Sequence, residues 1–271
     1  MNSDSVSHTS QLPNAPLTEV VFEMRWRLEG AKSIPIPFKN DPGFYVMADR
    51  FAMAASQHGF RFARKLSADP QATPHAISWR FYKQQEQPFP LWQIGPGILA
   101  VNESASYEWN SYKKLCLDAA RTLIRCYPKM HKFRLEPFYL ELRYLDSFSL
   151  DEKVNENLVG FLNNSTSLSL ALPTFVPGRL KDLANGQLIL SSAVKGMGET
   201  LFVVIVGTGV SQGIKSVIME SKVLTKLSET SIGRGQFVTE LGRWLGNAHN
   251  ITSPFFKEFI KEHLMKKFTG S

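Results

Sequence analysis

The stretch Leu12–Leu28 constrains the fold most, because it is the clearest strand in the chain. From Leu17 onward apolar and polar residues nearly alternate, and the two faces carry Val20, Phe22, Met24 and Trp26 on one side and Glu19, Glu23, Arg25 and Arg27 on the other. This alternation is typical of a strand with one buried face. Pro13 and Pro16 lack backbone donors and favour extended geometry, so they mark the entry to the sheet. We expect the first half of the protein to be laid down on this strand.

The remainder of the first half predicts two helices and three further strands. In chain order these elements are expected over residues 44–66 (helix), 76–82, 91–101, 106–127 (helix) and 134–148. Gly59 either ends or interrupts the first helix, and Pro128 ends the second. The order β-α-β-β-α-β is that of the ferredoxin-like fold, an antiparallel sheet with both helices on one face. We therefore predict a ferredoxin-like half over residues 12–149, preceded by a disordered leader over residues 1–11.

The second half, residues 150–271, predicts another α+β unit with its own antiparallel sheet. Its expected elements are a helix over 150–162, a strand over 166–174, hairpin strands over 187–194 and 201–206, and helices over 237–245 and 254–268. Glycines in the turn at 195–198 suit the positive backbone angles of a hairpin. The first of the two C-terminal helices could continue past Gly246. Residues 214–227 fit either a helix or a strand by spacing alone.

The opening stretch also carries a family resemblance. Residues 12–20, Leu-Pro-Asn-Ala-Pro-Leu-Thr-Glu-Val, resemble the N-terminal Leu-Pro-x-Ala-Pro-Leu-x-Glu-Val motif of a sporadically distributed family of uncharacterised bacterial proteins of about this length. Two later segments are similar as well: Leu140–Phe148, where Asp146 replaces the Asn of an Arg-Tyr-x-Asn pattern, and the ending in which His249 precedes Phe255–Phe259. The resemblance supplies no catalytic residues and favours a strand over 214–227. The scattered occurrence of the family implies mobile or defence-linked gene neighbourhoods.

Composition indicates a globular protein. The chain has 271 residues, of which 43% are hydrophobic, and this is too apolar for a disordered chain. Neither a membrane span nor a signal peptide is recognisable, so we expect a cytoplasmic location. Cys116 and Cys126 would lie about 15 Å apart in one helix, which is beyond disulfide reach, so we expect two reduced, buried thiols. The six histidines are scattered, and no spacing proposes a zinc site.

The glycines that follow the apolar run at 201–206 are the sharpest catalytic-looking motif. Gly207, Gly209 and Gly213 give G-x-G-x-x-x-G, whereas a dinucleotide-binding loop needs G-x-G-x-x-G and an acidic residue about 20 positions further on. A turn between two strands accounts for these glycines better. Whether they line a pocket is left open by the sequence.

Other catalytic patterns are also weak. His249 lies beside two asparagines near a helix end, where a histidine is more often a cap or a packed side chain. Glu136, Glu141 and Asp146 do not share one strand face, because 141 differs from the other two in parity. No G-x-S-x-G motif occurs. We therefore predict no catalytic residue, no metal and no cofactor, and an enzyme ranks third among the functions considered.

Basic residues are concentrated between 113 and 134. The net charge is +7, and this segment has seven basic residues against Asp118 alone. The candidate nucleic-acid-binding residues are Lys114, Arg121, Arg125, Lys129, Lys132 and Arg134. Three of them follow one helical face, which could bind a phosphate backbone with salt-sensitive, sequence-tolerant affinity. The alternative is the ordinary solvated face of an amphipathic helix.

The sequence therefore favours a non-catalytic protein-binding or accessory component, by family analogy in a bacterial defence or toxin–antitoxin-like locus. Its partner would be another protein, encoded nearby, that docks through sheet edges or through exposed aromatics around Trp244, Phe255 and Phe256. The second hypothesis is a sequence-nonspecific nucleic-acid-binding protein that uses the basic face at 113–134. The ligand and the oligomeric state do not follow from the sequence.

Overall fold

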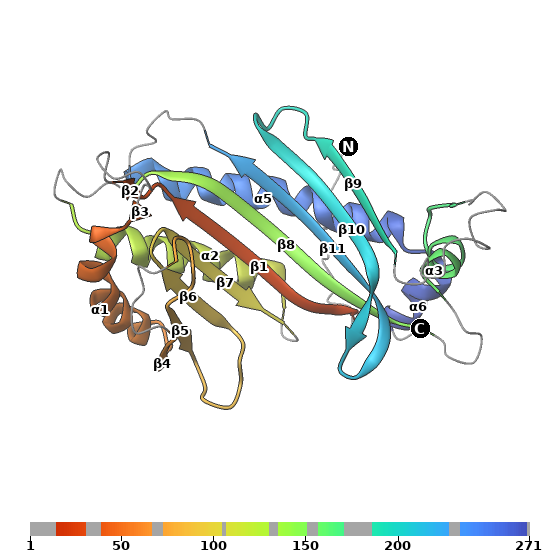
Figure 1. Cartoon of the computed structure of the whole chain (residues 1–271), viewed down its shortest axis with the longest axis horizontal. Helices are drawn as coiled ribbons and strands as arrows, with labels where there is room; N and C mark the ends of the chain where they lie inside the picture. Colours follow the sequence, from red (N-terminus) through yellow and green to blue (C-terminus); the bar gives the residue numbers. More distant parts are fainter. Residues whose placement is uncertain are drawn as a thin grey trace, which may run out of the picture.

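A nine-stranded antiparallel sheet forms the centre of the molecule (Figure 1). The computed structural model describes residues 15–30, 39–66, 73–104, 107–129, 135–150, 157–170, 186–227 and 234–269. The strands are β1 (Leu17–Trp26), β4 (Phe62–Lys65), β5 (Trp79–Tyr82), β6 (Leu91–Gly95), β7 (Ile98–Glu103), β8 (Pro137–Ser149), β9 (Gln187–Ala193), β10 (Thr200–Ser211) and β11 (Ile214–Lys226). Their spatial order is β4-β5-β6-β7-β1-β8-β11-β10-β9. Two further short strands, β2 (Glu29–Gly30) and β3 (Lys39–Asn40), pair with each other.

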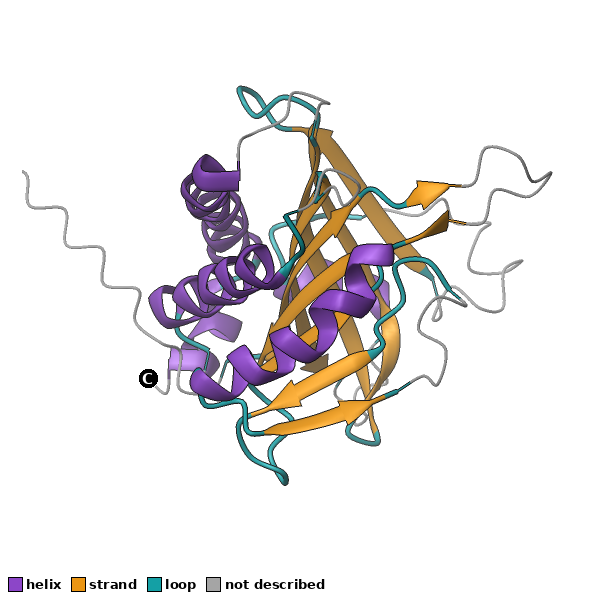
Figure 2. Cartoon of the chain, turned by 90° about the vertical axis from the view of Figure 1, so that its left-hand side faces the viewer, coloured by secondary structure: helices purple, strands orange, loops and turns teal. Residues whose placement is uncertain are grey.

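The helices of the described chain lie on one side of this sheet (Figure 2). They are α1 (Pro42–Gln57), α2 (Trp109–Cys126), α3 (Leu158–Ser165), α5 (Arg234–Phe259) and α6 (Glu262–Thr269). The sheet therefore has a helical face and a second face on which no described helix packs, named the uncovered face below, although β6 and β7 are buried on both of their faces. None of these helices combines the length and the apolar character that crossing a membrane requires.

The predicted alternation of the first strand is confirmed. Val20, Phe22, Met24 and Trp26 of β1 have no exposed surface and pack in the main core under α1, α2 and α5. Burying each of these side chains stabilises the fold by roughly 1.5–3 kcal/mol relative to exposure. A second, smaller core lies between the far ends of β8, β10 and β11 and the helices α3, α5 and α6. Cys116 and Cys126 are buried and unbonded, as expected.

The α+β class is confirmed, but the ferredoxin-like first half is not. The helix predicted over 44–66 ends at Gln57, because Gly59 adopts a φ of +87°, and Phe62–Lys65 forms a strand instead. The strand predicted over 91–101 is a hairpin whose turn contains Gly97 at a φ of +78°. The first half therefore contains more strands than the β-α-β-β-α-β order allows.

The division into two halves with separate sheets at residue 149 is not confirmed either. Strand β8, thirteen residues long, pairs with β1 on one edge and with β11 on the other. One sheet therefore runs through both predicted halves. Each strand offers backbone donors and acceptors on two edges, and β8 satisfies its second edge with a strand from the later part of the chain.

Predictions for the second half are partly confirmed. The hairpin of β9 and β10 turns at residues 195–198, and residues 214–226 form a strand. The helix predicted over 150–162 is α3, which begins at Leu158 and ends at Ser165. Residues 151–156 lie outside the described chain. Thr166 makes only an isolated bridge to Ile260 where a strand over 166–174 was predicted, and residues 171–174 are not described. The predicted leader, residues 1–11, also lies outside the described chain.

The C-terminal helices differ from the prediction in their boundary. Helix α5 continues through Gly246 and Pro254 to Phe259, and α6 begins at Glu262, after Ile260 and Lys261. Pro254 cannot donate to the carbonyl of Asn250, yet both residues are exposed, so water can take over that hydrogen bond. A proline on the solvent side of a helix therefore did not end it.

Candidate functional site

Charged side chains form rows across the uncovered face. Strand register places four transverse rows on β1, β8 and β11, namely Arg25–Tyr139–Lys226, Glu23–Glu141–Leu224, Val21–Arg143–Lys222 and Glu19–Leu145–Glu220. Successive rows are two residues apart, which is about 7 Å along a strand. The rows are alternately basic and acidic, so each charged row lies beside a row of opposite sign. Sequence reasoning recognised the charged face of β1 but missed the rows, because they depend on which strands are neighbours and at what register.

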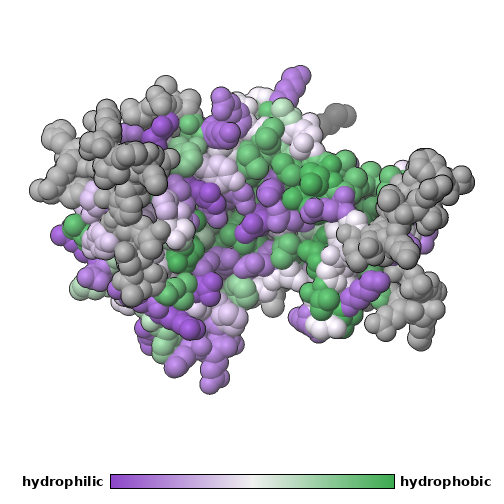
Figure 3. Space-filling model, viewed as in Figure 1, coloured by the Kyte–Doolittle hydropathy of each residue, from purple (hydrophilic) through white to green (hydrophobic). Residues whose placement is uncertain are grey.

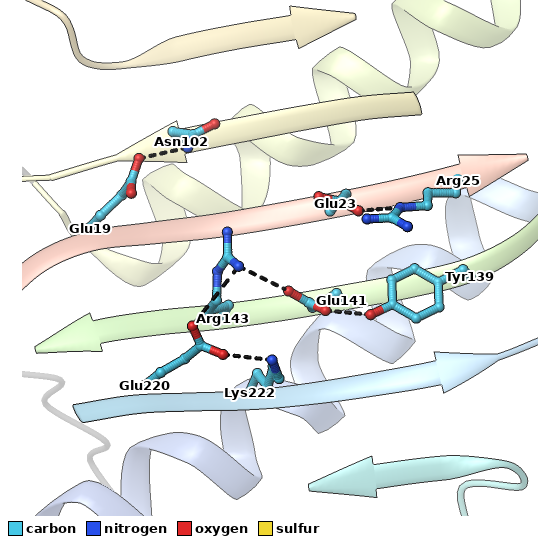
Figure 4. A network of polar contacts seen from close by, with 9 residues as sticks. All are labelled: Glu19, Glu23, Arg25, Asn102, Tyr139, Glu141, Arg143, Glu220 and Lys222. Atoms are coloured by element: carbon cyan, nitrogen blue, oxygen red, sulfur yellow. Dashed lines mark hydrogen bonds and ion pairs between the residues drawn. The ribbon is translucent and has the colours of Figure 1, made fainter. Parts of the chain in front are cut away.

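The rows neutralise one another through direct contacts (Figure 4). Arg143 lies 3.7 Å from Glu141 and 4.0 Å from Glu220, and Lys222 donates to Glu220 at 2.6 Å. Glu23, directly opposite Glu141, accepts from Arg25 at 2.5 Å. Carboxylates opposite each other repel, and these arginines offset the repulsion. The network therefore uses its charges internally and offers no free carboxylate pair.

A hydrogen-bonded chain of side chains extends this network toward β5. Arg80 donates to Gln93 at 2.9 Å, Gln93 to Asn102 at 2.8 Å, and Asn102 to Glu19 at 2.7 Å. Gln93 and Asn102 are only 7% and 6% exposed. Buried amides need such partners, and the chain links four adjacent strands. Its role is to hold the sheet in register.

Apolar side chains gather on the uncovered face beyond this network, over β9 and β10 (Figure 3). Ile189 is 58% exposed and Leu201 is 42% exposed, and both belong to the same side of the sheet as Val203 and Ile205. Large apolar residues this exposed are ordinary when isolated, but a group on one face marks an interaction surface.

Strand β9 is also the outermost strand of the described sheet on this side. Its sequence, Gln-Leu-Ile-Leu-Ser-Ser-Ala, contains no charge and no proline, and six of its seven residues are exposed. Leu190 is 38% exposed on the helical face, opposite in direction to Ile189. Edge strands usually carry charges or prolines that prevent pairing with another chain. β9 has neither charged residues nor proline, so its edge is the best candidate binding site. Its uncharged sequence was visible beforehand, but its edge position was not.

The basic residues predicted on α2 lie partly where they were expected. Lys114, Arg121, Arg125 and Lys129 are exposed, whereas residues 132 and 134 lie outside the described ranges. Arg121 is paired with Asp118 at 2.9 Å. The structure thus brings four of the six candidates to the surface and leaves one of them partly neutralised.

The aromatics proposed for protein binding are not freely exposed. Trp244 is only 9% exposed, donates to the Thr225 hydroxyl at 2.8 Å and packs 6.4 Å from Phe22, so its predicted exposure is wrong. Phe255 and Phe256 are half-buried against the second core. The reason is the rotation of α5, which directs these residues toward the sheet.

A buried polar cluster joins β8, α2 and α5. The Tyr144 hydroxyl lies 2.9 Å from Nδ1 of His249 and 3.0 Å from the Tyr107 hydroxyl, and the Trp109 ring stacks on His249 at 3.9 Å. Burial, followed by the nearby positive charges of Lys257 and Lys113, lowers the pKa of His249 to about 4. His249 is therefore a neutral, packed histidine, in agreement with the structural interpretation of its sequence position.

Asp146 follows Tyr144 by two residues on the same side of β8. It is only 4% exposed, and burial raises the pKa of its carboxyl group to about 7. Within the described part of the chain, no hydrogen bond or ion pair to this carboxyl group is found, and no cluster of His, Cys, Asp and Glu there could hold a metal ion. Asp146 is therefore a buried carboxyl group for which the described residues supply no hydrogen-bond or ion-pair partner.

The glycine motif lies in a hairpin. Gly207 and Gly209 are paired residues of β10, and the turn to β11 is formed by Gln212 and Gly213, whose φ is +80°. The predicted turn between two strands is therefore confirmed for Gly213, whereas Gly207 and Gly209 continue β10, which was expected to end at residue 206. None of these glycines precedes a helix as a dinucleotide loop would.

Comparison with known proteins adds no identity to this geometry. No protein-family model matches the chain, and no curated protein matches it.

Proposed function

We propose that this chain is a non-catalytic protein-binding component whose partner adds an extended strand to the outer edge of β9, beside which the structure describes no further strand. The observation that carries the proposal is the uncharged outer strand with exposed Ile189 and Leu190 on its two faces. In strand addition, main-chain hydrogen bonds supply affinity, and alternate side chains supply specificity.

The chemistry of the edge describes the strand that fits it. Backbone groups on the outer side of β9 offer donors and acceptors, and the side chains beside them are Leu188, Ile189, Leu190 and small serines. A charged partner strand would find no opposite charge there, and burying an unpaired charge is costly. The partner segment is therefore extended, uncharged and apolar at alternate positions.

Photo-crosslinking in the native host tests this proposal. A photoreactive amino acid replaces Ile189, and a matched variant carries it at Phe62 in β4, an outer-strand residue that is 40% exposed. We expect a discrete protein adduct at position 189 and at least tenfold less at position 62. Equal adduct formation at the two positions, or none at position 189, would refute strand addition at β9.

A second candidate function uses the basic face of α2, because Lys114, Arg121 and Arg125 are exposed on one helical face. We propose sequence-nonspecific binding to a phosphate backbone there. Charge reversal of Arg121 and Arg125 to Glu should weaken binding to duplex DNA at least tenfold and flatten its salt dependence. Arg243→Glu is the control, since Arg243 is also exposed and paired with a glutamate three residues away. Unchanged DNA affinity in the double variant would remove this candidate.

A further inference from the structure

We propose that the strand bound at β9 belongs to a second copy of this chain, with β9 pairing antiparallel to β9 around a twofold axis at Leu190. This inference rests on the proposed function and names its partner. The joined molecules would share one continuous antiparallel sheet, because β9 already pairs antiparallel with β10 on its inner edge.

Strand geometry fixes where such an axis can lie. Residues opposite each other in an antiparallel pair point to the same face, and successive residues of one strand point to opposite faces. A strand that pairs with its own copy must therefore place the axis on a residue and not between two residues. The central residue of Gln187–Ala193 is Leu190, and this register uses all seven residues.

Side-chain size is complementary in this register. Ile189 of one copy lies opposite Ser191 of the other on the uncovered face, and Leu188 lies opposite Ser192 on the helical face. Large residues thus meet small ones, and the two Leu190 side chains meet at the axis. Leu190 and Ile189, now 38% and 58% exposed, would each gain an apolar or small neighbour.

Charge also favours a second copy. β9 contains no ionisable residue, so its self-pairing brings no like charges together at the joint. Pairing of two seven-residue strands buries less than the roughly 1,600 Å² of a standard interface. We therefore expect a concentration-dependent dimer and not an obligate one.

Sedimentation of the purified full chain tests the stoichiometry. We expect the mass to rise from 30.5 kDa toward twice that value with concentration. Ser191→Lys should weaken dimerisation at least tenfold, because the added charges would lie beside the apolar joint. Ala63→Lys, at an exposed position of the opposite outer strand, should dimerise as the unaltered chain does. A chain that stays monomeric at every concentration would overturn the inference.

Cysteine crosslinking tests the register. Leu190→Cys should form an intermolecular disulfide on oxidation, because residue 190 meets its own copy at the axis. Gln187→Cys should not, since two copies of residue 187 would be about 20 Å apart, but a mixture of Gln187→Cys and Ala193→Cys chains should crosslink. The unaltered chain is the control for its two buried cysteines. Equal crosslinking of Gln187→Cys and Leu190→Cys alone would overturn the register.

Different results would refute strand addition at β9 and pairing of β9 with a second copy. If position 189 crosslinks in cells to another protein while the purified chain stays monomeric, strand addition holds and the second copy is excluded. If position 189 forms no adduct in cells, the proposed function itself is refuted.

Discussion

The two outer strands of the sheet differ in length and charge. β4 has four residues, Phe-Ala-Arg-Lys, and Arg64 lies directly opposite Arg80 of the next strand, while Lys65 covers the Trp79 ring at 5.9 Å. β9 has seven residues and no charge. Short length and positive charge are the usual protection against edge pairing, and β9 has neither. Of the two outer strands that the structure describes, β4 is therefore short and basic, whereas β9 is longer and uncharged.

The largest expected effect is the difference in stability lost when a core residue and a residue of β9 are replaced by alanine. Phe22→Ala should lower the free energy of unfolding by about 3–5 kcal/mol, because Phe22 is fully buried. Ile189→Ala should lower it by less than about 1 kcal/mol, since more than half of that side chain is already in water. Urea unfolding of dilute protein measures both. A large loss for Ile189→Ala would mean that β9 is needed for folding and would remove the basis of the comparison.

The second prediction concerns pH, which should change the free energy of unfolding but not the pairing through β9. Because the pKa of Asp146 is raised from 3.8 to about 7, its carboxyl group costs nothing below pH 4 and destabilises the fold progressively as pH rises to 7. Asp146→Asn should therefore raise the free energy of unfolding on the order of 2–4 kcal/mol at pH 8 and change it little at pH 4. Urea unfolding at the two pH values measures this, and an equal gain at both would contradict it.

His249 is expected to act in the opposite direction. Its pKa falls from 6.5 to about 4, so the stability that it contributes above pH 6.5 is lost as pH decreases toward 4. The two slopes offset each other between pH 6.5 and 4.5 in the unaltered chain, and Asp146→Asn should expose the loss due to His249. Dimerisation through β9 should not change between pH 6 and 8, because that strand has no titratable group.

The smallest expected effect comes from removing the protection of β4. Replacing Arg64 and Lys65 by Thr should strengthen self-association only a few-fold, because four residues offer little pairing even without charge. Sedimentation of this double variant in the Ser191→Lys background isolates the new edge. An increase as large as the loss caused by Ser191→Lys would show that charge alone, and not length, distinguishes the two edges.

Much of the local structure could be predicted. The alternation in β1, the helix α2 and the glycine turn between β9 and β10 were recognised because each depends on neighbouring residues. The hairpin of β6 and β7 was read as one strand, since the Pro96–Gly97 turn is short and lies between two apolar runs. The face of Trp244 could not be predicted, because helix rotation depends on what the helix packs against.

The candidate site was only partly predictable. An association through sheet edges was expected, and the seven uncharged residues of β9 are visible in the sequence. Nothing in them shows that β9 would be outermost, or that β8 would join strands from both ends of the chain.

By itself, the sequence determined the type of most strands and helices and the apolar side of strands such as β1, because the alternation of side chains is a local property. Only the tertiary structure decided which strands are neighbours, which of the described strands are outermost and which charges meet in rows. The physical reason is that backbone hydrogen bonds join any strand to any other, so strand order depends on packing the whole chain around one core.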